Sequence, residues 1–168
     1  RFTSQKNHKV ILNTLKLLPQ KIKILFAGDG DLKEDMESFV IDNNLGDRVF
    51  FLGPRSDIFS LMNMVDVNIL ASNYEGLSLA ALEAMSTGKP FIASNVDGLD
   101  FVVNNQSYLF ENEPESLGDL ILKLYNDKDF YDECAKNTFH RSKDFDIEIM
   151  VDKYLEVYKN QIENKGKL

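Results

Sequence analysis

The feature that most restricts the fold of this sequence is a regular alternation between short apolar runs and segments of helical periodicity. Apolar runs of strand length occur at residues 22–27, 49–52, 67–70, 91–93 and 108–110. Helical patterns separate most of them, at residues 32–43, 58–64 and 78–86. Continuous apolar runs are typical of strands buried on both faces, and intervening helices provide the crossovers that parallel strands need. The order therefore predicts an α/β fold with a mostly parallel sheet flanked by helices.

Helices are also expected at both ends of the chain. Asn7 is a candidate N-cap for a first helix, which must end before Pro19. The inward positions of this helix are expected to be Ile11, Thr14, Leu15 and Leu18. Three further helices are expected near residues 116–125, 130–141 and 147–163.

The last of these helices has a strongly amphipathic pattern. Its apolar side chains recur at helical spacing, at Ile147, Met150, Val151, Tyr154, Leu155 and Tyr158. Such a stripe needs a partner surface.

The length and charge of the chain narrow the class of function. A chain of 168 residues, 43% of them hydrophobic, is enough for one domain with its own core. The net charge of −8 argues against a general nucleic-acid binder, which needs basic side chains to neutralise phosphates. Six of the 19 basic residues, however, lie within residues 1–23, a stretch without an acidic residue. A small anion is therefore expected near the N-terminal segment.

Other features favour a cytoplasmic-type protein. The single cysteine, Cys134, excludes an internal disulfide, and no apolar run approaches the roughly 20 residues of a membrane-spanning helix. No signal-peptide pattern is found. Because the sequence begins at Arg1 without a methionine, we expect it to be part of a longer protein.

Two segments follow a predicted strand with glycine and then a helix, which is where open α/β sheets bind anions. The first, Gly28-Asp29-Gly30, lacks the third glycine of a dinucleotide fingerprint. A tight turn, with Asp29 or Asp31 capping the next helix, is the favoured interpretation of this segment.

The second segment, residues 71–85, is richer in chemistry. Glu75 precedes Gly76, Leu77 and Ser78, where a phosphate could approach the backbone. Glu83 is placed partly along the apolar side of the helix, where a carboxylate needs hydrogen-bond donors such as sugar hydroxyls. Alternatively, Glu83 is an ordinary helix residue that reaches solvent and Glu75 caps a turn. The residues alone do not decide between these interpretations.

The context of the two glutamates resembles a known family. Glu75 and Glu83, with seven residues between them, are followed by Ala84-Met85-Ser86-Thr87-Gly88-Lys89-Pro90-Phe91-Ile92-Ala93-Ser94. This block is similar to the E-x7-E signature and the EAMA-x-GKPVIAS stretch of group 1 (family 4) retaining glycosyltransferases. These enzymes have the GT-B fold of two Rossmann-like domains, and the block belongs to the C-terminal, nucleotide-sugar-binding one.

Other segments are similar to the family in the same order. Residues 1–6 resemble its G-R-x4-K phosphate segment, and residues 27–30 resemble its V-G-D-G turn. Residues 49–53 are similar to the strand whose end lies against the base, and residues 127–145 to the paired C-terminal helices. The resemblance therefore implies one donor-binding domain over residues 1–168.

The resemblance also implies a role for each matching residue. Arg1 and Lys6 would contact the diphosphate, and Glu83 would hold ribose hydroxyls. Glu75 would face the donor sugar and is the candidate catalytic residue. The remaining donor contacts would come from Phe51 and Leu52 beside the base and from Gly76, Leu77, Ser78 and Leu79 at the diphosphate and sugar. No metal is expected, because Arg1, Lys6 and the helix end can balance the charge of the diphosphate and no carboxylate pair at metal-binding spacing follows a strand. No cofactor is expected either, since the nucleoside-diphosphate sugar is the donor substrate.

The sequence departs from the family pattern in two places. Gly76-Leu77-Ser78-Leu79 replaces the common Gly-Phe-Gly-Leu, and residues 97–101 replace G-G-x-P-E, so no role is transferred there. We expect the strand that normally precedes the arginine, and the N-terminal domain with the acceptor site, to be absent from this chain. The isolated chain is therefore expected to bind donor without catalysing transfer.

The function that follows is the donor half of a retaining glycosyltransferase. It would transfer a sugar to a hydroxyl of a saccharide or lipid-linked acceptor, in surface polysaccharide or glycolipid synthesis, in the cytoplasm or at the cytoplasmic membrane face. Two alternatives remain at this point. One is a GT-B epimerase or phosphorylase, and the other is a non-catalytic α/β module that binds nucleotide or protein.

Overall fold

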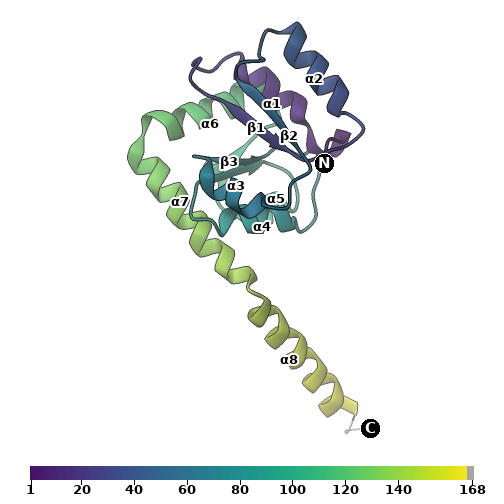
Figure 1. Cartoon of the computed structure of the whole chain (residues 1–168). Coiled ribbons are helices and arrows are strands. Elements are labelled where there is room, and N and C mark those ends of the chain that lie inside the picture. The colour runs from purple at the N-terminus through teal and green to yellow at the C-terminus, as the bar shows by residue number, and fades with distance from the viewer. Residues whose placement is uncertain (166–168) are drawn as a thin grey trace.

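The computed structural model describes residues 1–165 and confirms the α/β fold with parallel strands flanked by helices (Figure 1). The strands are β1 (Ile24–Ala27), β2 (Val49–Gly53), β3 (Asn68–Leu70), β4 (Phe91–Ser94) and β5 (Leu109–Phe110). Every strand pair is parallel. Each strand coincides with a predicted apolar run to within two residues at either end.

The helices lie close to the predicted ranges. They are α1 (His8–Leu15), α2 (Lys33–Asp42), α3 (Ile58–Met64), α4 (Leu79–Met85), α5 (Leu99–Val103), α6 (Pro114–Asn126), α7 (Lys128–Ser142) and α8 (Ile147–Lys165). Short 3-10 turns occur at η1 (Ser4–Lys6), η2 (Gln106–Tyr108) and η3 (Lys143–Phe145). Among the α-helices within residues 1–165, only α5 has no counterpart in the prediction.

The strands form two sheets rather than one. β1 pairs with β2, and β4 lies between β3 and β5 in a separate three-stranded sheet. The core continues across both sheets, because α1 packs against α6 and α2 while α4, α5 and α7 cover the second sheet. β4 is buried along its whole length. Parallel strands place their carboxyl ends at the same edge, so the loops after β3, β4 and β5 meet there.

The first six residues connect the two sheets. The Phe2 amide donates a hydrogen bond to the Asp29 carbonyl, which follows β1, over 3.0 Å. The Asn73 amide, which follows β3, donates to the Gln5 carbonyl over 2.7 Å. The N-terminal segment therefore lies beside the carboxyl ends of β1 and β3, which belong to different sheets.

The predicted cap of α1 is confirmed in position but not in its side-chain bond, and the predicted cap of α2 is wrong. Asn7 has a left-handed conformation (φ 38°), and its side chain does not cap α1. In this conformation it ends η1 and only its carbonyl joins the helix, as acceptor from the Val10 amide. No side chain caps α2, because Leu32 occupies the cap position, and Asp29 instead accepts a hydrogen bond from the Gly30 amide inside the turn.

The predicted amphipathic stripe of α8 is exposed. α8 contacts η3 and then extends away from the rest of the molecule (Figure 1). Between 46% and 63% of each of its six stripe residues is accessible to solvent. None of the helices within residues 1–165 is long and apolar enough to cross a membrane.

Candidate functional site

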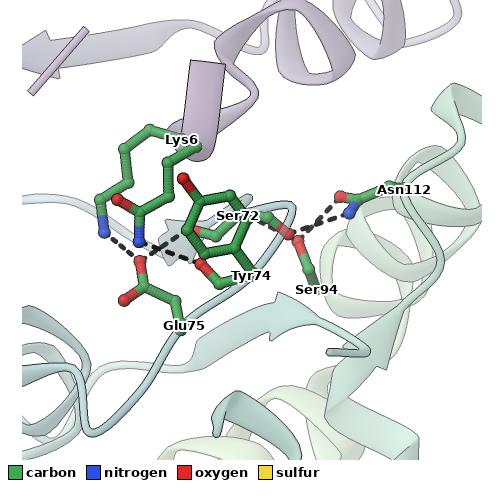
Figure 2. Close-up of polar contacts among 7 residues, drawn as sticks. Lys6, Ser72, Tyr74, Glu75, Ser94 and Asn112 are labelled. Carbon is green, nitrogen blue, oxygen red and sulfur yellow. Dashed lines mark hydrogen bonds and ion pairs between the residues drawn. The ribbon is translucent and has the colours of Figure 1, made fainter. Parts of the chain in front are cut away.

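The site begins with an ion pair between two segments that are far apart in sequence. Lys6 lies at the end of η1, and Glu75 lies in the loop between β3 and α4. The Lys6 ammonium contacts the Glu75 carboxylate directly (Figure 2). The Glu75 side chain is 8% exposed and that of Lys6 21%. A carboxylate this buried requires compensation for its lost hydration, and Lys6 supplies it.

Further hydrogen bonds hold the two segments together. Gln5 Nε2 donates to the Tyr74 carbonyl over 3.0 Å, and Asn73 Nδ2 donates to the Ser4 carbonyl over 2.8 Å. With the bond from the Asn73 amide to Gln5, they form a short polar seam between residues 4–5 and 73–74, next to the ion pair. The position of Lys6 relative to Glu75 is therefore fixed by the backbone as well as by charge.

A second group of polar side chains anchors the same loop at the end of β3. The Ser72 hydroxyl donates to Glu75 Oε1 over 3.0 Å, and the Ser72 backbone is bound by Ser94 and Asn112 (Figure 2). Ser72 and Ser94 are fully buried. Nothing in the sequence motifs pointed to Ser72 or Asn112, and Ser94 was only the last residue of the family-like stretch.

Gly98 and Gly30 allow close backbone approach at this site. A Cβ on Gly98 would lie 2.3 Å from the Glu75 carbonyl oxygen and 2.6 Å from that of Gly76. Gly98 also has φ +86°, in the region that favours glycine. A Cβ on Gly30 would lie 2.5 Å from the Phe2 carbonyl oxygen. Gly98 therefore makes room for the Glu75 loop, and Gly30 for the segment that carries Arg1 and Lys6.

An aromatic cluster supports the N-terminal segment. Phe2 is 1% exposed, and its ring stacks on the His8 imidazole with centroids 4.3 Å apart. Phe26 and Phe51 complete the cluster, with ring centroids 5.6 Å apart. Burial lowers the pKa of His8 to about 4, and the nearby positive charges of the N-terminus and Lys6 act in the same direction. His8 is therefore neutral at pH 7.

The α4 segment presents its outer face to solvent. Leu77 and Leu79 are 60% and 69% exposed, whereas Ser78 is buried. Glu83, one turn after Leu79, is exposed on the same side. The expectation that its carboxylate lies along the apolar side is wrong, because α4 buries Ala81, Ala84 and Met85 instead.

The structure thus brings some of the predicted site residues together and spreads others around them. Lys6 and Glu75 are in contact, and Arg1 is exposed at the start of the segment that carries Lys6. Phe51 and Leu52 are partly buried, with the Phe51 ring 5.8 Å from that of Phe2. Gly76, like Leu77 and Leu79, is exposed on the way into α4. The result is a cation and an anion at the carboxyl edge of the strands, next to an open helix face.

Residues 1–141 match the family model described as glycosyl transferases group 1. The chain is 34% identical over 154 residues to UDP-Gal:alpha-D-GlcNAc-diphosphoundecaprenol alpha-1,3-galactosyltransferase of Escherichia coli. That match covers 89% of this chain and 39% of the relative. N,N'-diacetylbacillosaminyl-diphospho-undecaprenol alpha-1,3-N-acetylgalactosaminyltransferase of Campylobacter jejuni is 26% identical over 162 residues, covering 95% of this chain and 43% of the relative.

Solved structures of GT-B glycosyltransferases share the fold. The Anabaena protein Alr3699/HepE in complex with UDP superposes with a TM-score of 0.89 at 24% identity, covering 95% of this chain and 47% of that one. Sucrose-phosphate synthase from Thermosynechococcus elongatus has a TM-score of 0.86 at 26% identity, covering 98% and 44%. The chain therefore spans less than half the length of these relatives.

Proposed function

The chain belongs to the group 1 glycosyl transferases, and we propose that it is the nucleotide-sugar-binding part of a retaining glycosyltransferase. In this proposal, the donor is a nucleoside-diphosphate sugar held at the carboxyl edge of the strands. Lys6 and Arg1 bind the diphosphate, and Glu75 faces the sugar. Glu83 binds the ribose from the exposed face of α4, while Phe51 and Leu52 lie toward the base.

The observation that best supports this proposal is the direct contact between Lys6 and Glu75. The resemblance assigns the two residues to adjacent parts of one ligand, the diphosphate and the sugar. They are 69 positions apart in sequence and nevertheless in contact. A lysine ammonium has three N–H donors, so Lys6 can keep Glu75 and still donate to a phosphate oxygen.

The chemistry follows from the charges at the site. Transfer of a glycosyl group to a hydroxyl releases a nucleoside diphosphate, and negative charge grows on the phosphate as the bond to the sugar breaks. Lys6 and Arg1 would stabilise that charge, and the backbone N–H groups of residues 76–79 would add hydrogen bonds. We expect no metal or cofactor to be required.

We further propose the setting in which the full protein acts. The Escherichia coli and Campylobacter jejuni relatives are named for acceptors linked to diphosphoundecaprenol, and the former for UDP-Gal as donor. By analogy, the acceptor of this protein would be lipid-linked, the donor a UDP-sugar, and the reaction a step in surface polysaccharide or glycolipid synthesis at the cytoplasmic face of a membrane. A further domain would supply the acceptor site.

Calorimetry of the chain with UDP, GDP and ADP, and with uridine, tests the proposed function. We expect one diphosphate to bind, and Lys6→Ala to weaken its binding by about 1–3 kcal/mol, the range of a charge-assisted hydrogen bond. The nucleoside should bind the two proteins equally. Lys128→Ala is the control, because Lys128 forms an exposed ion pair with Asp132 on α7. An equal loss of affinity for the nucleoside would contradict the phosphate role of Lys6.

A further inference from the structure

The carboxyl ends of three neighbouring strands are joined by a closed set of side-chain hydrogen bonds. Ser94 ends β4, the central strand, while Ser72 follows β3 and Asn112 follows β5. The Ser72 amide donates to Ser94 Oγ over 2.8 Å, and the Ser94 hydroxyl donates to Asn112 Oδ1 over 2.9 Å. Asn112 Nδ2 donates back to the Ser72 carbonyl over 2.9 Å. Both backbone groups of Ser72 are therefore fixed by side chains.

Because other side chains hold the Ser72 backbone, its hydroxyl has a fixed position from which it binds Glu75. The hydroxyl donates to Glu75 Oε1, and the same oxygen accepts from the Lys6 ammonium (Figure 2). A continuous chain of polar contacts thus leads from Asn112 through Ser94 and Ser72 to Glu75, and from there to Lys6. We call these five residues the relay.

Because most of the relay is buried, the loss of one of its hydrogen bonds is costly. Ser72 and Ser94 are fully buried and Glu75 nearly so, and a buried polar group that loses its partner is costly. The seam holds the backbone next to Lys6, but the flexible four-carbon side chain of Lys6 places its ammonium according to the anion that binds it. An accurately placed Glu75 therefore orders Lys6 before a ligand arrives, which reduces the entropy lost on binding.

We propose that Asn112 and Ser94 are positioning residues for the donor diphosphate, and that they act through Ser72 and Glu75 on Lys6. The proposal rests on the proposed function only in assigning the diphosphate to Lys6. The order of the relay itself follows from the hydrogen bonds of the ligand-free chain.

A double-mutant cycle tests the proposal. Within the relay, the Ser72 hydroxyl is the group that connects Ser72 to Glu75, so removing it should cut Asn112 off from Lys6. Asn112→Ala should weaken binding of the nucleoside diphosphate by about threefold to tenfold, the effect of one net hydrogen bond. In a Ser72→Ala background, the same substitution should change affinity less than twofold. A purely structural role for Asn112 would give the same loss in both backgrounds and would overturn the proposal.

Asn95→Ala is the matched control for Asn112→Ala. Asn95 follows Ser94 and donates to Glu111 Oε1 over 2.8 Å, so it joins the ends of β4 and β5 without contacting Ser72 or Glu75. Its removal should leave diphosphate affinity unchanged. If Asn112→Ala does not fold, Asn112→Asp replaces it, because it keeps an acceptor for Ser94 and replaces the donor to Ser72 with a carboxylate oxygen, which cannot bind the Ser72 carbonyl.

A ligand-free measurement separates this proposal from the proposed function. In protein with labelled lysine, the Lys6 side-chain NMR signal should shift with Asn112→Ala, but not when Ser72→Ala is already present. If wild type binds no nucleoside diphosphate, the proposed function fails, and this signal alone decides whether the relay exists. An unchanged Lys6 signal in Asn112→Ala would overturn the relay even where the diphosphate binds.

Discussion

Lys6 and Glu75 show which features of the site the sequence can predict and which require the fold. Sequence motifs singled out both side chains, since each matched a family position. The resemblance implied that they lie at neighbouring parts of one ligand, but not their direct ion pair, because 69 positions separate them and no periodic pattern relates a loop residue to a 3-10 turn. The same holds for Ser72, Ser94 and Asn112, which are ordinary polar residues until parallel strands place their ends together. The motifs therefore identified the two charged residues, whereas only the strand topology identified the polar side chains that hold them in place.

Gly98 gives a stability prediction at the residue scale. Gly98→Ala should lower the free energy of unfolding by about 1–3 kcal/mol, since it combines an unfavourable φ with a Cβ 2.3 Å from the Glu75 carbonyl oxygen. Gly46→Ala is the matched control, because a Cβ there meets nothing within 4 Å. That change should be neutral or slightly stabilising. Urea unfolding of the three proteins provides the measurement, and equal losses at both positions would refute the close-approach argument.

His8 gives a prediction of pH dependence. Its pKa is about 4 in the folded chain and 6.5 in the unfolded one, so the unfolded chain binds more protons between these values. The contribution of neutral His8 to the free energy of unfolding is fully present above pH 6.5 and is lost as the pH falls toward 4. We expect a loss of about 1–2 kcal/mol after allowing for screening of a partly exposed ring.

His8→Phe provides the comparison, because a phenyl ring can keep the stacking on Phe2 without titrating. Urea unfolding at pH 7 and pH 4.5 should show a smaller fall in stability for this variant than for wild type. Acidic residues titrate in both proteins, and their contribution cancels in the difference. The same fall in both would mean that His8 is protonated as readily in the folded chain as in the unfolded one.

Individual helices show which sequence signals are reliable. Long periodic segments such as α6 were predicted well, because burying one face requires regular spacing. α5 was missed because it has only five residues, between Gly98 and the left-handed Asn104, and is too short to show a period. The pattern of α8 correctly predicted an amphipathic helix, but a pattern cannot state whether a partner surface exists within the same chain. In the described residues, that stripe faces solvent.

The exposed face of α4 yields a prediction about donor binding. Because Glu83 is exposed, Glu83→Gln should change the free energy of unfolding by less than about 0.5 kcal/mol. If Glu83 binds the ribose hydroxyls, the substitution should weaken binding of a ribonucleoside diphosphate and scarcely affect its 2′,3′-dideoxy analogue. Calorimetry with both nucleotides measures the difference. An equal loss of affinity for both nucleotides would show that Glu83 does not act on the ribose hydroxyls.

At the scale of the whole molecule, the division into two sheets is the main departure from a single continuous sheet. β1 pairs only with β2, and β3 only with β4, so each has one edge without a strand partner in the described residues. The segment after Arg1 is bound to the ends of both strands, through Asp29 and Asn73. A strand running directly into Arg1 would therefore enter between β1 and β3, parallel to both. That such a strand belongs there remains a prediction.

An extension of about ten residues ahead of Arg1, containing a typical strand of about five β-branched residues, should pair with both free edges and stabilise the chain. Central parallel strands are apolar on both faces, so the new strand should also bury apolar surface. In urea, we expect a higher midpoint and a steeper slope, because unfolding would expose more surface. A glycine-serine extension of equal length is the control and should leave both values unchanged. If the apolar extension behaves like the control, the edges of β1 and β3 do not accept a strand, and the two-sheet arrangement is stable by itself.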